Sequence, residues 1–104
     1  MSTEYKNATI VEKANVYFDG KVNSRTVTTE EGKKITLGFM QPGEYEFNTG
    51  APELMVVVNG AMSIQMPGSD SWTEYPEGTQ FDVPGNSSFK VQVTDFADYV
   101  CSYL

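Results

Sequence analysis

Two glycine-punctuated stretches decide the fold of this chain: GEYEFNTGAPE at residues 43–53, with Gly60 following, and GTQFDVPG at residues 78–85. Within and beside them apolar and polar side chains alternate, as over residues 80–83 and 89–93. An alternation with period two is typical of a β-strand that buries one face. The two stretches therefore predict short strands separated by tight turns.

Turn-forming residue pairs recur along the rest of the chain: Glu31-Gly32, Pro42-Gly43, Asn59-Gly60, Pro67-Gly68, Glu77-Gly78 and Pro84-Gly85. The pair Asn59-Gly60 is a strong signal for a two-residue hairpin, because both central residues of such a turn take positive φ. About eight or more short strands at this spacing indicate a β-sandwich or a barrel. The run 54–58 is apolar on both faces, which predicts a central strand covered on both sides.

The length of 104 residues predicts a single domain. Residues 15–104 are expected to form the barrel. Residues 1–14 precede it and are expected to form an N-terminal arm or an extra edge strand.

The composition excludes several classes of function. The net charge of −7 disfavours nucleic-acid polymers and anionic membranes as partners. The chain has no histidine, which excludes His-based acid–base catalysis and His-ligated metal sites. Its single cysteine, Cys101, excludes an intrachain disulfide and a thiolate zinc site. No signal peptide and no stretch of roughly 20 apolar residues is found, so a cytoplasmic location is expected.

The two opening stretches resemble the conserved motifs of the cupin fold, in which strands and glycine turns line one end of a jelly-roll barrel. In metal-binding cupins the first motif carries two histidines and a glutamate, and the second carries another histidine. Here Glu53 stands at the glutamate position, whereas the histidine positions fall within residues 46–49 and at Phe89. The resemblance implies an all-β, cupin-type jelly-roll barrel without a metal site.

A narrower resemblance rests on residues 15–27, 37–47, 53–60, Trp72, 78–85, 88–93 and 99–103. Together these resemble the small bacterial cupins known as pyrimidine/purine nucleoside phosphorylases, over almost all of residues 15–104. The resemblance implies phosphorolysis, in which a nucleoside and phosphate give a free base and a pentose 1-phosphate. It also implies inorganic phosphate as co-substrate and no metal or organic cofactor.

To cleave an N-glycosidic bond with phosphate, the enzyme must bind the phosphate, bind the ribose hydroxyls and stabilise the leaving base. Arg25, the only arginine, has a guanidinium fork that suits phosphate oxygens, and Lys21 is a second candidate for phosphate binding. Glu53 should share a strand face with Met55 and Val57, where an apolar wall would raise its pKa or call for a hydrogen bond. Its carboxylate would accept hydrogen bonds from ribose hydroxyls or offset oxocarbenium charge. Glu53 and Arg25 are the predicted catalytic residues, although either side chain would also suit a solvated surface.

The predicted nucleoside-binding residues are Tyr45, Phe47, Thr49, Met55, Ser88 and Phe89. Aromatic rings stack on any base, which suits broad specificity, but they equally suit a barrel core. Thr49 and Ser88 are candidate hydrogen-bond donors, although Ser and Thr are common near strand ends. Cys101 alternates with Tyr99 and Tyr103 and is expected to be a core residue rather than a nucleophile.

Three functions are compatible with these residues. The first is a metal-independent nucleoside phosphorylase, and the second is a non-catalytic cupin module that binds a small nucleobase-like ligand. The third is an interaction protein in which the strand at residues 54–58 drives dimerisation. A homodimer is expected because the chain is short and that strand is apolar on both faces.

Overall fold

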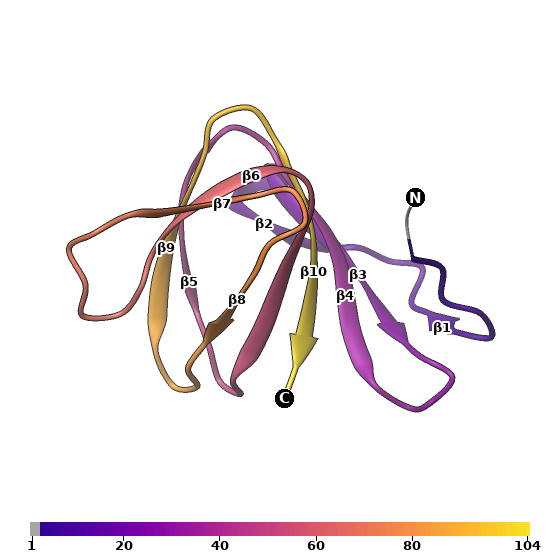
Figure 1. Ribbon diagram of the computed structural model, residues 1–104. Helices are drawn as coiled ribbons and strands as arrows, with labels where there is room; N and C mark the ends of the chain where they lie inside the picture. The colour runs from indigo at the N-terminus through magenta and orange to yellow at the C-terminus, as the bar shows by residue number, and fades with distance from the viewer. Residues whose placement is uncertain (1–2) are drawn as a thin grey trace.

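The described part of the chain forms ten antiparallel strands, which curl around a common interior (Figure 1). The computed structural model describes residues 3–104, and within them one 3-10 turn, η1, is the sole helical element. No helix in that range has the length and apolar character needed to cross a membrane. The elements are β1 (Thr9–Ile10), β2 (Asn15–Tyr17), η1 (Phe18–Gly20), β3 (Val22–Thr28), β4 (Lys34–Met40), β5 (Gly43–Asn48), β6 (Glu53–Gln65), β7 (Thr73–Pro76), β8 (Gln80–Val83), β9 (Ser88–Val93) and β10 (Ala97–Tyr103). The prediction of an all-β single domain is confirmed.

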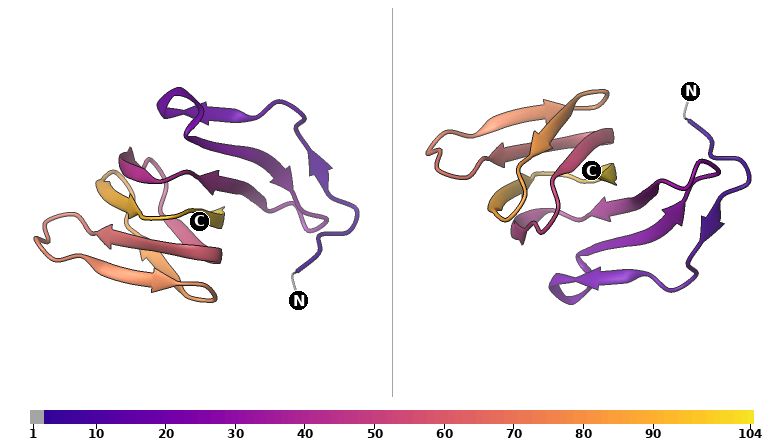
Figure 2. Two further views of the ribbon diagram at one scale, coloured as in Figure 1. Left: turned by 90° about the horizontal axis from the view of Figure 1, so that it is seen from above. Right: turned by 90° about the horizontal axis from the view of Figure 1, so that it is seen from below.

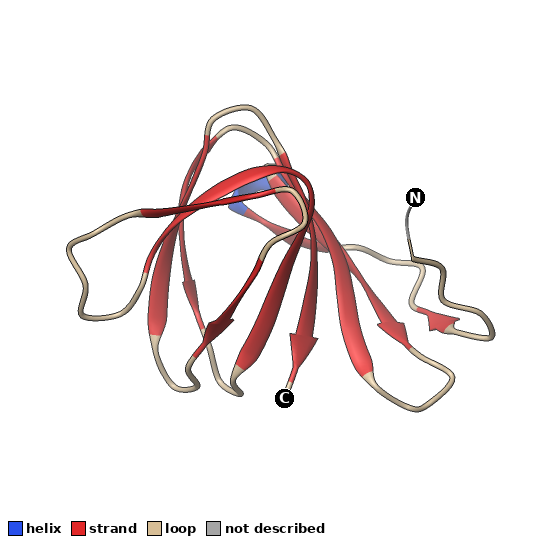
Figure 3. Ribbon diagram, in the orientation of Figure 1, coloured by secondary structure: helices blue, strands red, loops and turns tan. Residues whose placement is uncertain are grey.

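The sheet has two walls that face each other across the interior (Figure 2). Its strand order is β1-β3-β4-β10-β6-β9-β5, with β2 paired to β3 and with β7 and β8 paired to β6. Strands β3, β4, β10 and the first half of β6 form one wall. Strands β5, β9 and the last part of β6 form the other. Turns and loops join the strands, and the loop between β6 and β7 extends furthest from the sheet, as Figure 3 shows.

Strand β6 joins the two walls, and it overturns the predicted hairpin at Asn59-Gly60. β6 is one continuous strand of thirteen residues that passes through this pair. Its register with β10 shifts beside the pair, because Asp98 faces Asn59 whereas Tyr99 faces Val57. The shift leaves Val58 as the extra residue of a β-bulge, which bends a strand without reversing it.

Gly60 supplies the conformation that this bend requires. Its φ is +74°, and a Cβ atom at this position would collide with the backbone carbonyl oxygen of Phe96. The Asn-Gly pair therefore does signal a positive φ, but it is used to bend a strand rather than to close a turn. The other predicted turns are confirmed between strands, although Gly43 of the pair Pro42-Gly43 is already the first residue of β5.

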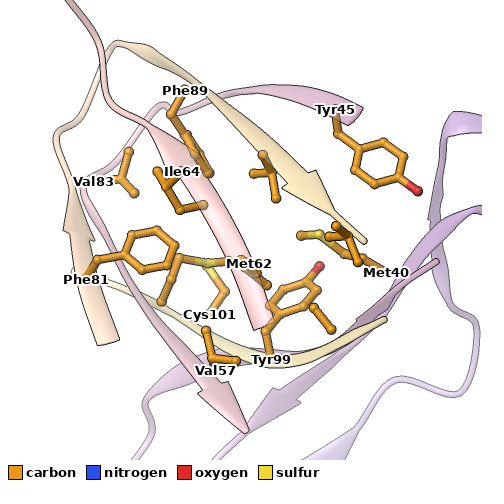
Figure 4. Packing of buried hydrophobic residues seen from close by; sticks show 14 of the residues in the cluster. Met40, Tyr45, Val57, Met62, Ile64, Phe81, Val83, Phe89, Tyr99 and Cys101 are labelled. Atoms are coloured by element: carbon orange, nitrogen blue, oxygen red, sulfur yellow. The ribbon is translucent and has the colours of Figure 1, made fainter. Parts of the chain in front are cut away.

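The core lies between the two walls and is built from the inward side chains of both (Figure 4). On β6, Met55 and Val57 are buried, as their alternation predicts. The prediction that this strand is covered on both sides is only half right. The outward side chains Leu54, Val56 and Val58 are partly exposed in the single chain.

The N-terminal segment pairs along the open edge of β3. Strand β1 is antiparallel to β3, with Thr9 opposite Thr28 and Ile10 opposite Val27. The backbone N–H of Val11 continues the contact by donating to the carbonyl oxygen of Thr26 at 3.0 Å. Residues 9–11 thus extend the sheet by a short edge strand.

Substitution of Gly60 by alanine should destabilise the protein more than the same change at Gly68. Both glycines have a φ near +75°, at +74° and +76°, but a Cβ at Gly68 would meet no atom within 4 Å. Gly68→Ala should therefore lower the free energy of unfolding by about 1–2 kcal/mol, the cost of the left-handed conformation alone. Gly60→Ala should lower it further, since the collision with Phe96 is added. Urea unfolding measures both, and equal losses would contradict the close approach at Gly60.

Candidate functional site

A cavity of about 290 Å³ lies inside the curled sheet, between the two walls. Its lining residues are Tyr17, Ser24, Thr36, Met40, Phe47, Asn48, Gly50, Glu53, Met55, Phe89, Tyr99, Cys101 and Tyr103. One wall, from β4, β6 and β10, supplies most of the polar groups. The other, from β5 and β9, supplies two phenylalanine rings. The cavity therefore has a polar side and an aromatic side.

The polar side is assembled by strand register. On β10, Tyr103 lies opposite Glu53 of β6, and Cys101 lies opposite Met55 of β6 and Thr36 of β4. Side chains that are directly opposite or diagonal on one sheet face lie within contact distance. The carboxyl, thiol and hydroxyl groups of this wall are therefore neighbours.

Burial sets the protonation of these groups. It raises the pKa of the Glu53 carboxyl, while a hydrogen bond from the Cys101 thiol acts in the opposite direction. Burial also raises the pKa of Cys101 to about 12 and that of Tyr103 to about 12. The thiol and the phenol are therefore neutral hydrogen-bond donors near neutral pH, and Glu53 is the acceptor among them.

Gly38 makes room for Tyr99 in the same wall. The two residues lie opposite each other on β4 and β10. A Cβ atom at position 38 would collide with the tyrosine ring, so glycine lets this ring lie across the strand. Figure 4 shows Tyr99 pointing into the interior near Met40. Burial raises the pKa of Tyr99 well above its usual range, which keeps its hydroxyl protonated.

The aromatic side is a connected set of rings. Phe47 stacks on Phe89 with ring centroids 5.8 Å apart, and Tyr17 meets Phe47 edge-on at 6.4 Å. Phe18 closes the set from outside, at 5.4 Å from Phe47 and 5.0 Å from Tyr45. Flat apolar faces of this kind suit a planar ring as ligand.

The turn that places Tyr17 and Phe18 is held in an unfavourable backbone conformation. Phe18 and Asp19 have φ values of +52° and +56°, and Gly20 follows at +90°. Left-handed residues other than glycine cost free energy and persist where the surroundings fix them. Here the ring contacts of Phe18 with β5 fix the turn at the edge of the cavity.

Four of the predicted site residues line the cavity: Glu53, Phe47, Met55 and Phe89. The raised pKa expected for Glu53 agrees with the structure, since its carboxyl is partly buried. The sequence could bring these residues together because Glu53 and Met55 alternate on one strand and the rings lie on paired strands.

The remaining predicted nucleoside-binding residues lie outside the cavity lining. The Tyr45 ring belongs to the core, and its hydroxyl donates to the carbonyl oxygen of Gln41 at 2.7 Å. The Thr49 hydroxyl donates to the carbonyl oxygen of Pro84 at 2.7 Å, which ties the two turns together. Ser88 is partly buried at the start of β9.

Arg25 and Lys21 also lie outside the cavity lining, and both are exposed. On β3 the inward position belongs to Ser24, so alternation points Arg25 to the outer face. The Arg25 Nε donates to the carbonyl oxygen of Glu12 at 3.0 Å, which fastens the N-terminal segment to the sheet. Their phosphate role stays a prediction, because in the single chain neither reaches the cavity.

Several lining residues were not singled out from the sequence, chiefly Tyr17, Thr36, Asn48, Tyr99 and Tyr103. The alternation of Tyr99, Cys101 and Tyr103 did place them on one face, and that face proves to be the polar side of the cavity. Thr36 and Tyr17 gave no comparable signal, because their place depends on how β4 and η1 pack.

The metal of histidine-bearing cupins does not fit this donor set. Among the described residues, no three His, Cys, Asp or Glu side chains are grouped closely enough to hold a metal ion. The cavity itself offers only Glu53 and Cys101 of these types. The arrangement suits a ligand that combines a neutral planar ring with hydroxyl groups instead.

Solved structures share this fold. A protein of unknown function from Acinetobacter sp. ADP1 matches with a TM-score of 0.95 and 36% identity, over 99% of this chain and 100% of that one. The Clostridium difficile EutQ protein matches with a TM-score of 0.65 and 19% identity, over 79% of this chain and 61% of that one, which bears on the fold alone. The match to the first structure confirms the predicted cupin-type barrel.

Sequence comparison gives the family. A relative from Geobacter sulfurreducens named pyrimidine/purine nucleoside phosphorylase is 54% identical over 102 residues, which cover 98% of each chain. The family model described as pyrimidine/purine nucleoside phosphorylase matches residues 12–103. The chain therefore belongs to the pyrimidine/purine nucleoside phosphorylase family.

Proposed function

We propose that this protein cleaves pyrimidine and purine nucleosides with inorganic phosphate. A phosphate oxygen bonds to C1′, and the C1′–N bond breaks with its electron pair on the base. The proton of monohydrogen phosphate balances the one that the free base gains. Family membership supports this function, and the cavity with one aromatic and one polar side is the observation that carries it. We also propose that the enzyme is cytoplasmic and acts without a metal or an organic cofactor.

The aromatic side suits the nucleobase. Phe47 and Phe89 form a platform with Tyr17 edge-on to Phe47, and base–aromatic stacking tolerates any base because every base has a π face. Broad specificity follows from this, since stacking does not read the pattern of donors and acceptors on the base edge. The cavity volume of about 290 Å³ lies near the lower end for small-molecule sites.

The polar side suits the sugar. An ionised Glu53 accepts hydrogen bonds from ribose hydroxyls and lies where it offsets positive charge that develops on the ring. The Cys101 thiol, neutral and next to this carboxyl, holds it in place by a hydrogen bond. The tyrosine hydroxyls of Tyr99 and Tyr103 stay protonated and are donors for substrate oxygens.

We also propose a homodimer formed through the outer face of β4, β6 and β10. A groove of about 430 Å³ on this face is lined by apolar side chains that include Leu37, Val56, Val58 and Val100. Strand register makes Leu37, Val100 and Val56 one continuous row. Outward apolar rows of this kind are typical of a face that a second copy covers.

Base release should depend on phosphate. Purified protein is incubated with uridine, adenosine or inosine, with and without phosphate, and free base is followed by chromatography. We expect release only when phosphate is present. A protein that merely binds nucleosides would show a thermal shift without release, and that result would refute the proposed activity.

Glu53→Gln should reduce kcat/KM by about ten- to a hundredfold, the effect of losing hydrogen bonds to a charged acceptor. In the wild type, kcat/KM should rise with pH through the raised pKa of Glu53, and the variant should lack this rise. Glu46→Gln, an exposed carboxyl on β5, is the matched control and should behave as the wild type.

The same variant should be at least as stable as the wild type at neutral pH. Burial raises the carboxyl pKa in the folded protein, so ionisation destabilises the fold as pH rises through that value. Below the unfolded value of about 4.3 both states are protonated and the advantage of glutamine should vanish. Urea unfolding at neutral pH and at a pH below the unfolded value checks this, and a less stable variant at neutral pH would contradict the raised pKa of the partly buried carboxyl.

A charged side chain introduced on the outer face of β4, β6 and β10 should dissociate the dimer. The wild type should show twice the 11.5 kDa of one chain by light scattering after size exclusion. Val100→Asp should shift the mass to that of one chain, because a buried unpaired carboxylate is unfavourable. Gln92→Asp, on the exposed outer side of β9, adds the same charge and should stay dimeric. A wild-type protein with the mass of one chain would exclude the dimer.

A further inference from the structure

Phosphate binding requires positive charge that the cavity lining does not provide. Of the described residues that line the cavity, none is lysine or arginine, and one is the carboxyl-bearing Glu53. A phosphate dianion next to an ionised carboxylate is unfavourable unless a cation lies nearby. The predicted phosphate ligands Arg25 and Lys21 do not line it. A cation at the rim of the cavity would supply this charge.

Lys34 is the cation that the structure places at this rim. It is the first residue of β4, and its Nζ lies 5.4 Å from the centroid of the Tyr103 ring. Tyr103 is itself part of the cavity lining and lies opposite Glu53. Thr36, two residues after Lys34 on the same strand, also lines the cavity. By the alternation of side chains, Lys34 shares the inward face of β4.

The ring contact holds a mobile side chain where an anion would need it. An ammonium group over an aromatic face is attracted by the ring, and this attraction favours one position of the flexible lysine side chain. Both Lys34 and Tyr103 are accessible, the tyrosine at 39% exposure. The ammonium is therefore free to form bonds to a phosphate that enters beside the ring.

We propose that Lys34 forms the phosphate subsite, together with the hydroxyls of Thr36 and Tyr103, on the β4–β10 wall. The proposal rests on the phosphorylase function argued above. It gives the reaction a direction, because the base platform of Phe47 and Phe89 belongs to the opposite wall. Phosphate then approaches C1′ from one side of the cavity while the base departs on the other, which is the geometry that a displacement needs.

Direct binding of inorganic phosphate tests the subsite without relying on turnover. Isothermal titration of the full chain with phosphate is compared for the wild type, Lys34→Ala, Lys34→Arg and Lys33→Ala. Lys33→Ala is the matched control, since it removes the same charge from the neighbouring position in the turn before β4. Lys34→Ala should weaken phosphate binding about ten- to a hundredfold. Lys34→Arg should restore most of it, and Lys33→Ala should change little.

Steady-state kinetics add a second readout. The KM for phosphate should rise in Lys34→Ala while the KM for the nucleoside stays near that of the wild type. Arg25→Ala and Lys21→Ala are measured alongside, because a larger rise in either would move the subsite away from Lys34. Equal phosphate affinity in Lys34→Ala and Lys33→Ala, or no phosphate binding by the wild type, would overturn the proposal.

Loss of the phosphate subsite and loss of the phosphorylase activity would give different results. If the wild type releases base in the presence of phosphate and Lys34→Ala does so with an unchanged KM for phosphate, the enzyme stands and the subsite falls. If the wild type binds phosphate in a Lys34-dependent way but releases no base, the subsite stands and the phosphorylase function falls.

Discussion

The close approach of Gly60 to the carbonyl of Phe96 is the constraint on which the barrel depends. It lets one long strand, β6, bend instead of turning back, so that the strand pairs with β10 in one wall and β9 in the other. Without the bend the two walls would not share a strand, and the inward side chains of each would have no opposite layer to pack against. The cavity follows from this, since it is the part of the enclosed space that core side chains leave unfilled.

The chemistry of the cavity depends on where β6 begins. Glu53 is the first residue of this strand, and the strands beside it bring Tyr103 and Cys101 to the same face. Partial burial raises the pKa of this carboxyl, and the neighbouring Cys101 thiol holds it in place by a hydrogen bond. The histidines of metal-binding cupins are not required for that arrangement. The fold thus keeps a cavity in its interior, and the charged side chain among the lining residues is one carboxylate.

Much of this was accessible from the sequence, and the failures have physical causes. Alternation in residues 80–83, 89–93 and 99–103 located strands and their buried faces, because one buried face imposes a period of two. Local signals could not distinguish a hairpin from a bend at Asn59-Gly60, since both use a positive φ and only the partner strand decides. For the site, a motif and its strand phase located Glu53 and Met55. Lys34, Thr36 and Tyr17 depend on contacts between distant segments, which no local pattern encodes.

The shielded state of Cys101 has a practical consequence. A thiol with its pKa raised to about 12 carries almost no thiolate at neutral pH, and thiolate is the nucleophile that attacks alkylating reagents and disulfides. The native cysteine should therefore not react with maleimides under mild conditions. A second cysteine introduced on an exposed strand position would then be the single reactive handle on the chain. Fluorophores or spin labels could be attached there to follow ligand entry, with the native thiol left in place.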